Sequence, residues 1–160
     1  QSDYAVPLSN RSLAWSWDAP TFNTIIWGAL IDSDKNVYVA GQNGIAKLSP
    51  DGVLLWTNGM SSEMPTLVGD TLVGMRSWDC MAFALSLETG ETLWQKQVWP
   101  TNGAHGDFVE AYNGVAVVGV GRAGPMGSGG APSERAGGFD LETKQLLWTY
   151  KLDCGIWNVM

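Results

Sequence analysis

His105 is the only histidine of the 160-residue chain, and two carboxylates, Asp107 and Glu110, follow it closely. A histidine beside carboxylates could bind a metal ion or transfer a proton. Structural zinc sites, however, use four strong ligands, and a single histidine among loop residues fixes no Ser-His-Asp geometry. Because Gly103 and Gly106 flank the histidine, we predict a turn here rather than a catalytic or metal site.

A glycine pattern is the second candidate for chemistry. Gly119, Gly121 and Gly124 have the spacing G-x-G-x-x-G and follow an apolar run. A dinucleotide site needs this motif to open a helix whose N-terminus faces the pyrophosphate. Pro125 and the Gly/Ser residues at 127–130 follow instead, and they disfavour a helix. We therefore predict that residues 121–137 form a long loop between two strands.

Two cysteines and two tryptophans are the other side chains that could react or bind a ligand. Cys80 and Cys154 lie far apart in the sequence, so two thiols are at least as consistent with the pattern as a disulfide. Trp78 and Trp99 could expose rings that bind carbohydrate. Burial in ordinary packing also explains them, and it is the interpretation we favour, because large aromatic side chains are usually well buried.

The composition excludes some classes of partner. The net charge is −7 and only 16% of the residues are charged, whereas nucleic-acid sites carry a basic patch, so we expect no nucleic-acid partner. No apolar run reaches the length of about eighteen residues that a transmembrane helix needs. The chain begins at Gln1 rather than Met, and a removed signal peptide would make it extracytoplasmic: periplasmic, secreted or in an organelle lumen.

A repeat indicates which elements must position these residues. Residues 84–94 read ALSLETGETLW, and residues 46–56 (AKLSPDGVLLW) and 138–148 (GFDLETKQLLW) align with them without a gap. With Trp15 added, a tryptophan recurs about every forty residues, apart from the longer interval that contains the Gly-rich segment. This period is typical of β-propeller blades.

Each copy is expected to be a β-hairpin with fixed turn chemistry. Gly90 is predicted to adopt a positive φ, which glycine does without steric cost. Ser86 and Asp140 are predicted to accept backbone N–H groups within their turns. Lys144 stands at the glycine position of the third copy, where a left-handed conformation costs roughly 1 kcal/mol. That copy either carries this cost or has a different turn.

The pattern Ala-x-Asp-x-x-Thr-Gly-x-x-x-Trp resembles the PQQ repeat of quinoprotein alcohol dehydrogenase-like β-propellers. In that family the tryptophan stacks on the alanine of its own motif and on the glycine of a neighbouring motif. The resemblance therefore implies that the matching residues hold adjacent blades together. These residues are Ala46, Gly52, Trp56, Ala84, Thr89, Gly90, Trp94, Asp140, Thr143 and Trp148.

The expected fold is an all-β propeller with about three complete blades of four antiparallel strands. Turn signals such as Asp32-Ser33-Asp34-Lys35 separate the strands. Because the flanking strands belong to incomplete blades, we expect the chain to be part of a longer propeller. The expected layout is an N-terminal arm at 1–10, the last strand of a preceding blade at 11–18, blades at about 24–58, 62–98 and 105–151, and the start of a further blade at 154–160.

The leading functional hypothesis is a non-catalytic propeller module that binds another protein, with no cofactor. Its candidate contact loop contains Arg122, Pro125, Met126, Ser128, Glu134 and Arg135. One alternative is a part of a PQQ-dependent dehydrogenase, which the family resemblance would supply with PQQ and calcium. The vicinal cysteine pair common in those enzymes is missing here. A second alternative is a carbohydrate-binding propeller.

Overall fold

The computed structural model describes residues 12–19, 25–62, 64–76, 79–99, 105–121 and 135–151. Within these ranges the chain forms twelve strands and no helix. The strands are β1 Ile25–Ile31, β2 Val37–Gly41, β3 Gly44–Leu48, β4 Leu54–Asn58, β5 Thr66–Val68, β6 Thr71–Arg76, β7 Met81–Ser86, β8 Thr92–Gln97, β9 His105–Tyr112, β10 Val115–Gly121, β11 Arg135–Asp140 and β12 Leu146–Lys151.

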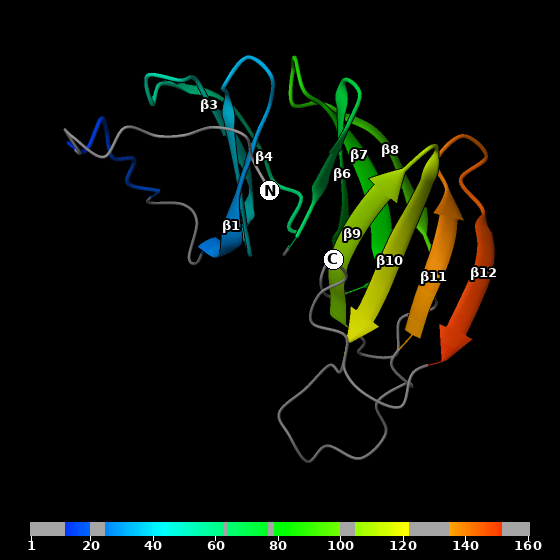
Figure 1. Ribbon diagram of the computed structural model, residues 1–160. Coiled ribbons are helices and arrows are strands. Elements are labelled where there is room, and N and C mark those ends of the chain that lie inside the picture. Colours follow the sequence, from blue (N-terminus) through cyan, green and yellow to red (C-terminus); the bar gives the residue numbers. More distant parts are fainter. Residues whose placement is uncertain are drawn as a thin grey trace, which may run out of the picture.

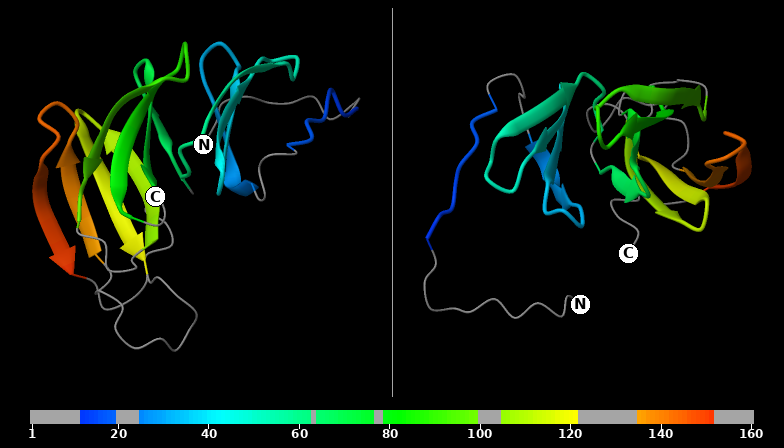
Figure 2. Two further views of the ribbon diagram at one scale, coloured as in Figure 1. Left: turned by 180° about the vertical axis from the view of Figure 1, so that it is seen from behind. Right: turned by 90° about the horizontal axis from the view of Figure 1, so that it is seen from above.

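Three four-stranded antiparallel sheets contain these strands, each in simple consecutive order. The first sheet is β1–β4, the second is β5–β8 and the third is β9–β12 (Figure 1). Seen from above, the second sheet lies between the other two (Figure 2). The predicted all-β architecture of antiparallel four-stranded blades is confirmed.

The second sheet is buried on both faces, which explains why β6 and β7 each contain four consecutive buried residues. Successive side chains of a strand point to opposite faces of its sheet. Leu72 and Leu85 therefore pack towards the first sheet, in a cluster with Tyr38 and Ile45. Residues one place along each strand, such as Val73, pack towards the third sheet. That second cluster also contains Met75, Ala82, Ala84, Val109, Ala116, Val118 and Phe139.

The N-terminal segment differs from the prediction. Residues 12–19 form no strand, although the sequence predicted a blade strand at 11–18. A strand needs a partner that takes up its backbone hydrogen bonds, and no ladder joins this segment to the described strands. The predicted arm at 1–10 and the predicted strand at 154–160 lie outside the described residues.

The long loop of the third sheet is shorter than predicted at both ends. Gly121 is the last residue of β10, and β11 begins at Arg135, so both strands extend into the predicted loop, and its remaining residues, 122–134, lie outside the described residues. In the ladder of β10 and β11, Arg135 pairs with Val120. Arg135 is thus a strand residue rather than part of the contact loop, because backbone pairing continues to the ends of both strands.

Within the described ranges, no helix is long and apolar enough to cross a membrane.

Candidate functional site

Trp56 of the first sheet lies against the turn of the second. Its Nε1 donates to the carbonyl oxygen of Leu87 at 3.1 Å, and Asn58 Nδ2 donates to the carbonyl oxygen of Gly90 at 2.8 Å. Gly90 has φ +75°, and a Cβ built on it would lie 2.6 Å from Cδ2 of Trp56. Only glycine fits this position, because it both tolerates the left-handed backbone and leaves room for the ring.

The same arrangement joins the N-terminal segment to the first sheet. Trp15 Nε1 donates to the carbonyl oxygen of Pro50 at 2.9 Å. Gly52 has φ +80°, and a Cβ built on it would lie 2.7 Å from Cδ2 of Trp15. A tryptophan from the preceding part of the chain therefore covers a left-handed glycine in both junctions.

The junction between the second and third sheets replaces glycine with a cation. Lys144 stands at the glycine position and keeps the left-handed backbone, with φ +61°. Its Nζ lies 4.9 Å from the ring centroid of Trp94 and donates to the carbonyl oxygen of Leu141. Leu141 corresponds to Leu87, so the ammonium takes the carbonyl that an indole N–H takes in the earlier junction. The ring of Trp94 stacks on Phe139, with centroids 6.0 Å apart and planes at 27°.

Short polar side chains shape the turns at these junctions. Ser86 Oγ accepts the backbone N–H of Thr89 at 3.2 Å. Asp140 Oδ1 accepts the backbone N–H groups of Glu142 at 2.9 Å and Thr143 at 2.6 Å. Hydrogen bonds from Thr143 lower the pKa of Asp140 below its ordinary value, and the bond from the Thr143 backbone has the largest effect. Both residues thus accept N–H groups within their turns, as Asx and Ser/Thr turns do.

In the first copy of the repeat, the strand pairing opposite the tryptophan is shifted by one residue relative to the second copy. Lys47, not Ala46, lies opposite Trp56, whereas Ala84 lies opposite Trp94. The cause is a shorter turn: the N–H of Ser49 bonds to Val53, while the N–H of Ser86 bonds to Glu91. Because side chains alternate between faces, one residue of offset reverses the face. Ala46 is fully buried, but the residue across from its tryptophan is Lys47.

Trp148 ends the series with an exposed ring. It lies opposite Gly138 of its own sheet, and a Cβ built on Gly138 would collide with the indole. The side chain is 47% exposed. Glycine at 138, where the second copy has Ala84, therefore lets the ring lie directly on the neighbouring strand.

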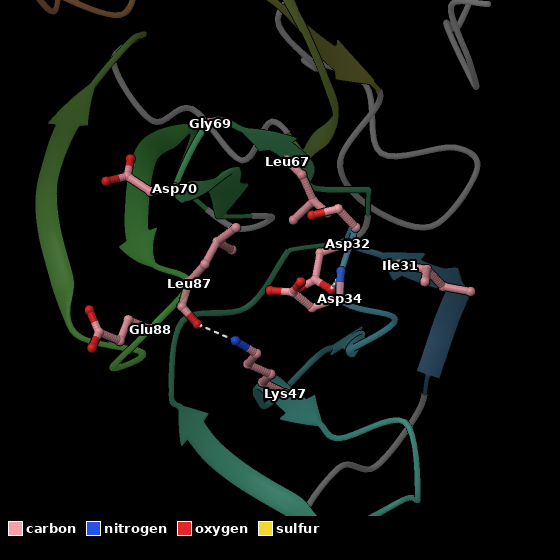
Figure 3. Close-up of a pocket in the computed structure, with 10 residues that line it drawn as sticks. Ile31, Asp32, Asp34, Lys47, Leu67, Gly69, Asp70, Leu87 and Glu88 are labelled. Carbon is pink, nitrogen blue, oxygen red and sulfur yellow. Dashed lines mark hydrogen bonds between the residues drawn. The ribbon is translucent and has the colours of Figure 1, made fainter.

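A cleft of about 570 Å³ lies between the first and second sheets (Figure 3). It is lined by the β1–β2 turn, by Lys47 of β3 and by the β5–β6 and β7–β8 turns of the second sheet. The lining residues are Ile31, Asp32, Ser33, Asp34, Lys47, Leu67, Gly69, Asp70, Leu87 and Glu88. Four of these residues carry a carboxylate and one carries an ammonium group.

Asp32 organises the wall of this cleft that belongs to the first sheet. Its Oδ1 accepts the backbone N–H groups of Asp34 and Asn36, and its Oδ2 accepts Asn36 Nδ2 at 2.9 Å and the hydroxyl of Tyr38 at 2.8 Å. Burial alone would raise the pKa of Asp32, but hydrogen bonds from Asn36 and Tyr38 outweigh it and lower that pKa. Burial and the bond to Asp32 raise the pKa of Tyr38. Asp32 is thus a structural carboxylate whose oxygens are already used.

Lys47 connects the two sheets across the cleft. Its Nζ donates to the carbonyl oxygen of Leu87 at 2.7 Å and lies 5.4 Å from the ring centroid of Tyr38. Leu87 therefore accepts hydrogen bonds from both Lys47 and Trp56. No ion pair joins the other three carboxylates of the cleft to a cation within the described part of the chain.

The predicted chemical candidates are not brought together. His105 lies on β9 opposite Gly121, in a strand and not in the predicted turn, since the ladder extends beyond Val109. Gly119 and Gly121 both belong to strand β10, so neither begins a helix. Within the described ranges, no group of three His, Cys, Asp or Glu side chains could hold a metal ion.

Trp99 is 7% exposed and packs in the core between the second and third sheets. A Cβ built on Gly137 would lie 2.8 Å from its Cζ2, so Trp99 presents no open ring to a carbohydrate. Cys80 is fully buried. Trp78, Cys154 and most of the contact loop, namely Arg122, Pro125, Met126, Ser128 and Glu134, lie outside the described residues.

Sequence reasoning missed the cleft between the sheets. Its carboxylates come from three turns that are separate in the chain, at Asp32 and Asp34, at Asp70 and at Glu88, and the repeat pattern predicted no contact between these turns. The available signal was the run Asp32-Ser33-Asp34, read together with Asp70, which stands at the place of Asp32 in the next repeat.

No protein-family model matches the chain. In sequence, 68 residues are 37% identical to the outer membrane protein assembly factor BamB of Burkholderia pseudomallei. The match covers 40% of this chain and 18% of that protein.

Three solved structures share the fold. A europium-containing methanol dehydrogenase superposes with a TM-score of 0.72 at 19% identity, over 88% of this chain and 27% of that one. BamB from Moraxella catarrhalis superposes with a TM-score of 0.61 at 20% identity, over 88% of this chain and 40% of that one. The quinohemoprotein alcohol dehydrogenase of Comamonas testosteroni superposes with a TM-score of 0.68 at 16% identity, over 88% of this chain and 23% of that one.

The chain thus spans less than half the length of each of these proteins. At these identities the structural likeness shows the fold alone. The repeated Trp–turn junctions and these likenesses show that the chain folds into four-stranded β-propeller blades, a fold that it shares with these dehydrogenases and with BamB.

Proposed function

We propose that this chain is part of a non-catalytic, extracytoplasmic β-propeller that binds another protein. The observation that carries the proposal is the 37% identity over 68 residues to a protein named as an outer membrane protein assembly factor. The two dehydrogenases share 19% and 16% identity with the chain, which shows a common fold and carries no argument for dehydrogenase chemistry. The name of the relative also supports a location outside the cytosol.

The junction residues support the same proposal. We assign Trp56, Gly90, Trp94 and the residues equivalent to them to holding adjacent blades together. Their contacts are with the next sheet: Trp56 with Gly90 and Leu87, and Trp94 with Lys144 and with Phe139 of β11. Side chains used in this way give the propeller a rigid frame on which loops can bind a partner.

The loop between β10 and β11 is the contact region that we propose. Residues 122–134 connect two neighbouring strands of a blade, and long connections between strands of a rigid scaffold often carry binding residues. The loop contains Arg122 and Glu134, and between them Gly, Pro, Ala, Met and Ser residues. Its strand-bound neighbour Arg135 anchors the end of the loop.

Site-specific photo-crosslinking in cells tests this function. The full-length protein would carry a photoreactive residue in place of Ser128, with Glu142 as the control position. We expect a discrete adduct with one protein, found in the cell-envelope fraction, from position 128 only. Identical adduct patterns at both positions, or a cytosolic adduct alone, would contradict the proposal.

A cofactor titration separates this function from the dehydrogenase alternative. The full-length protein is mixed with PQQ and calcium, and quinone absorbance and dye reduction by alcohols are recorded. We expect neither a bound-quinone spectrum nor dye reduction. A stoichiometric quinone spectrum with alcohol-dependent dye reduction would establish the alternative instead.

A further inference from the structure

We propose that the cleft between the first and second sheets binds a lysine or arginine side chain of the partner protein. The assignment rests on the proposed protein-binding function. It adds a second contact, with a stated chemistry, to the loop at 122–134.

Charge is the first argument for a cationic side chain. The cleft carries four carboxylates and one ammonium. The carboxylate oxygens of Asp32 already accept hydrogen bonds from Asn36, Tyr38 and the backbone of its own turn. The ammonium group of Lys47 donates a hydrogen bond to the carbonyl oxygen of Leu87.

The carboxylates of Asp34, Asp70 and Glu88 remain. All three residues are exposed, and no ion pair involves them within the described ranges. A partner that supplies a positive charge here would meet three acceptors and one cation that is already engaged.

The apolar part of the lining favours a long side chain over a bare ion. Ile31 is 65% exposed, and Leu67 and Leu87 are half-buried at the cleft. Lysine and arginine bury an aliphatic stem along such a surface while the charged end stays near water and acceptors.

A metal ion fits less well. Its carboxylate ligands must converge, and no three acidic, His or Cys side chains do so in the described part of the chain. Figure 3 shows the same separation: Asp70 and Glu88 lie on one side of the cleft, and Asp32 and Asp34 lie on the other.

Lys47 shows how such a side chain can lie in this place. It belongs to the first sheet, extends across the cleft and donates from Nζ to a carbonyl of the second sheet (Figure 3). A partner's lysine or arginine would lie beside it, above the leucines and between the acidic turns.

Matched charge-reversal variants test the cleft. In the first, Asp70→Lys and Glu88→Lys change the cleft. In the second, Asp51→Lys and Glu142→Lys change two acidic residues that are also exposed but lie outside the cleft. The net charge changes by the same amount in both variants, so general attraction to an acidic protein is matched. Thermal unfolding of each variant checks that the fold is retained.

The probe is a fluorescein-labelled tetra-arginine peptide, with tetra-citrulline as its neutral counterpart, and binding is read by fluorescence anisotropy. We expect the wild type and the second variant to bind tetra-arginine with equal affinity, and the first variant to bind about tenfold more weakly, since two exposed charge pairs are lost. Raised salt should remove most of this difference. Tetra-citrulline should not bind.

Equal loss in both variants would overturn the proposal, because it would show only attraction by net charge. Equal binding by all three proteins would also overturn it. The photo-crosslink from position 128 separates the two proposals. If it persists while the cleft variants show no selective loss, only the cleft assignment fails; if it fails while the cleft binds tetra-arginine selectively, the partner contact at the loop fails.

Discussion

The indole of Trp56 lies directly on the backbone of Gly90, thirty-four positions later in the chain and in the next sheet. The ring occupies the space in which a side chain at position 90 would stand, and its Nε1 reaches the carbonyl of Leu87 in the same turn. A left-handed turn residue and an aromatic ring are therefore one joint between two blades.

Gly90→Ala should be strongly destabilising. The new Cβ would meet the ring of Trp56 and would also force alanine into a left-handed backbone. Together these effects should cost about 2–4 kcal/mol in the free energy of unfolding, measured by urea denaturation. Gly69→Ala is the control, because Gly69 has φ +58° with nothing within 4 Å of the built Cβ. It should lose only about 1 kcal/mol, and equal losses at both positions would show that the contact with Trp56 contributes nothing.

Trp56→Phe should weaken the junction by about 1–2 kcal/mol, since it removes the Nε1 bond to Leu87 and part of the ring contact. Trp99→Phe provides the comparison, because Trp99 Nε1 is buried without a hydrogen-bond partner within the described structure. That substitution loses packing but no hydrogen bond, so at equal temperature its urea midpoint should fall less. A larger fall for Trp99→Phe would contradict this ranking.

Lys144 should show the opposing effects of strain and contact. Lys144→Ala keeps the left-handed backbone but loses the ammonium over Trp94, whereas Lys144→Gly loses the contact and also relieves the strain. The glycine variant should therefore be about 1 kcal/mol more stable than the alanine variant by urea unfolding. If the alanine variant were the more stable one, position 144 would not be left-handed in solution.

Asp32 should make stability depend on acid pH. Its folded-state pKa is lowered, so its contribution is present above the unfolded pKa of about 4 and is lost as pH falls through the folded pKa. Asp32→Asn should therefore reduce the free energy of unfolding at neutral pH, and the difference from the wild type should shrink in strong acid. Urea unfolding across the acid range measures this. A difference that does not vary with pH would mean that the carboxylate charge is not the cause.

The local elements were largely predictable from the sequence. The repeat predicted the hairpins, and the turn residues predicted their local geometry: Gly90 is left-handed, and Asp140 and Ser86 accept backbone N–H groups. These properties depend on residues within a few places of one another, which is why the local pattern was sufficient.

Other features depended on partners that the pattern could not supply. The segment at 12–19 has the residues of a strand but no ladder partner among the described strands. The sequence favoured burial for Trp99, which is confirmed, but the side chains that bury it, those between the second and third sheets, are visible only in the folded structure.

The amino-acid sequence by itself determined the period of the repeat, the hairpin in each copy and the aromatic residue that each copy presents to the next. The three-dimensional structure was needed to show which residue of each copy lies opposite the tryptophan, and therefore which face of the sheet that residue shares with it. A turn one residue shorter puts Lys47 where the pattern expected Ala46, and side chains that alternate along a strand turn that single residue into a change of face. The acidic cleft has the same origin, because its two walls are turns that meet only when neighbouring blades pack together.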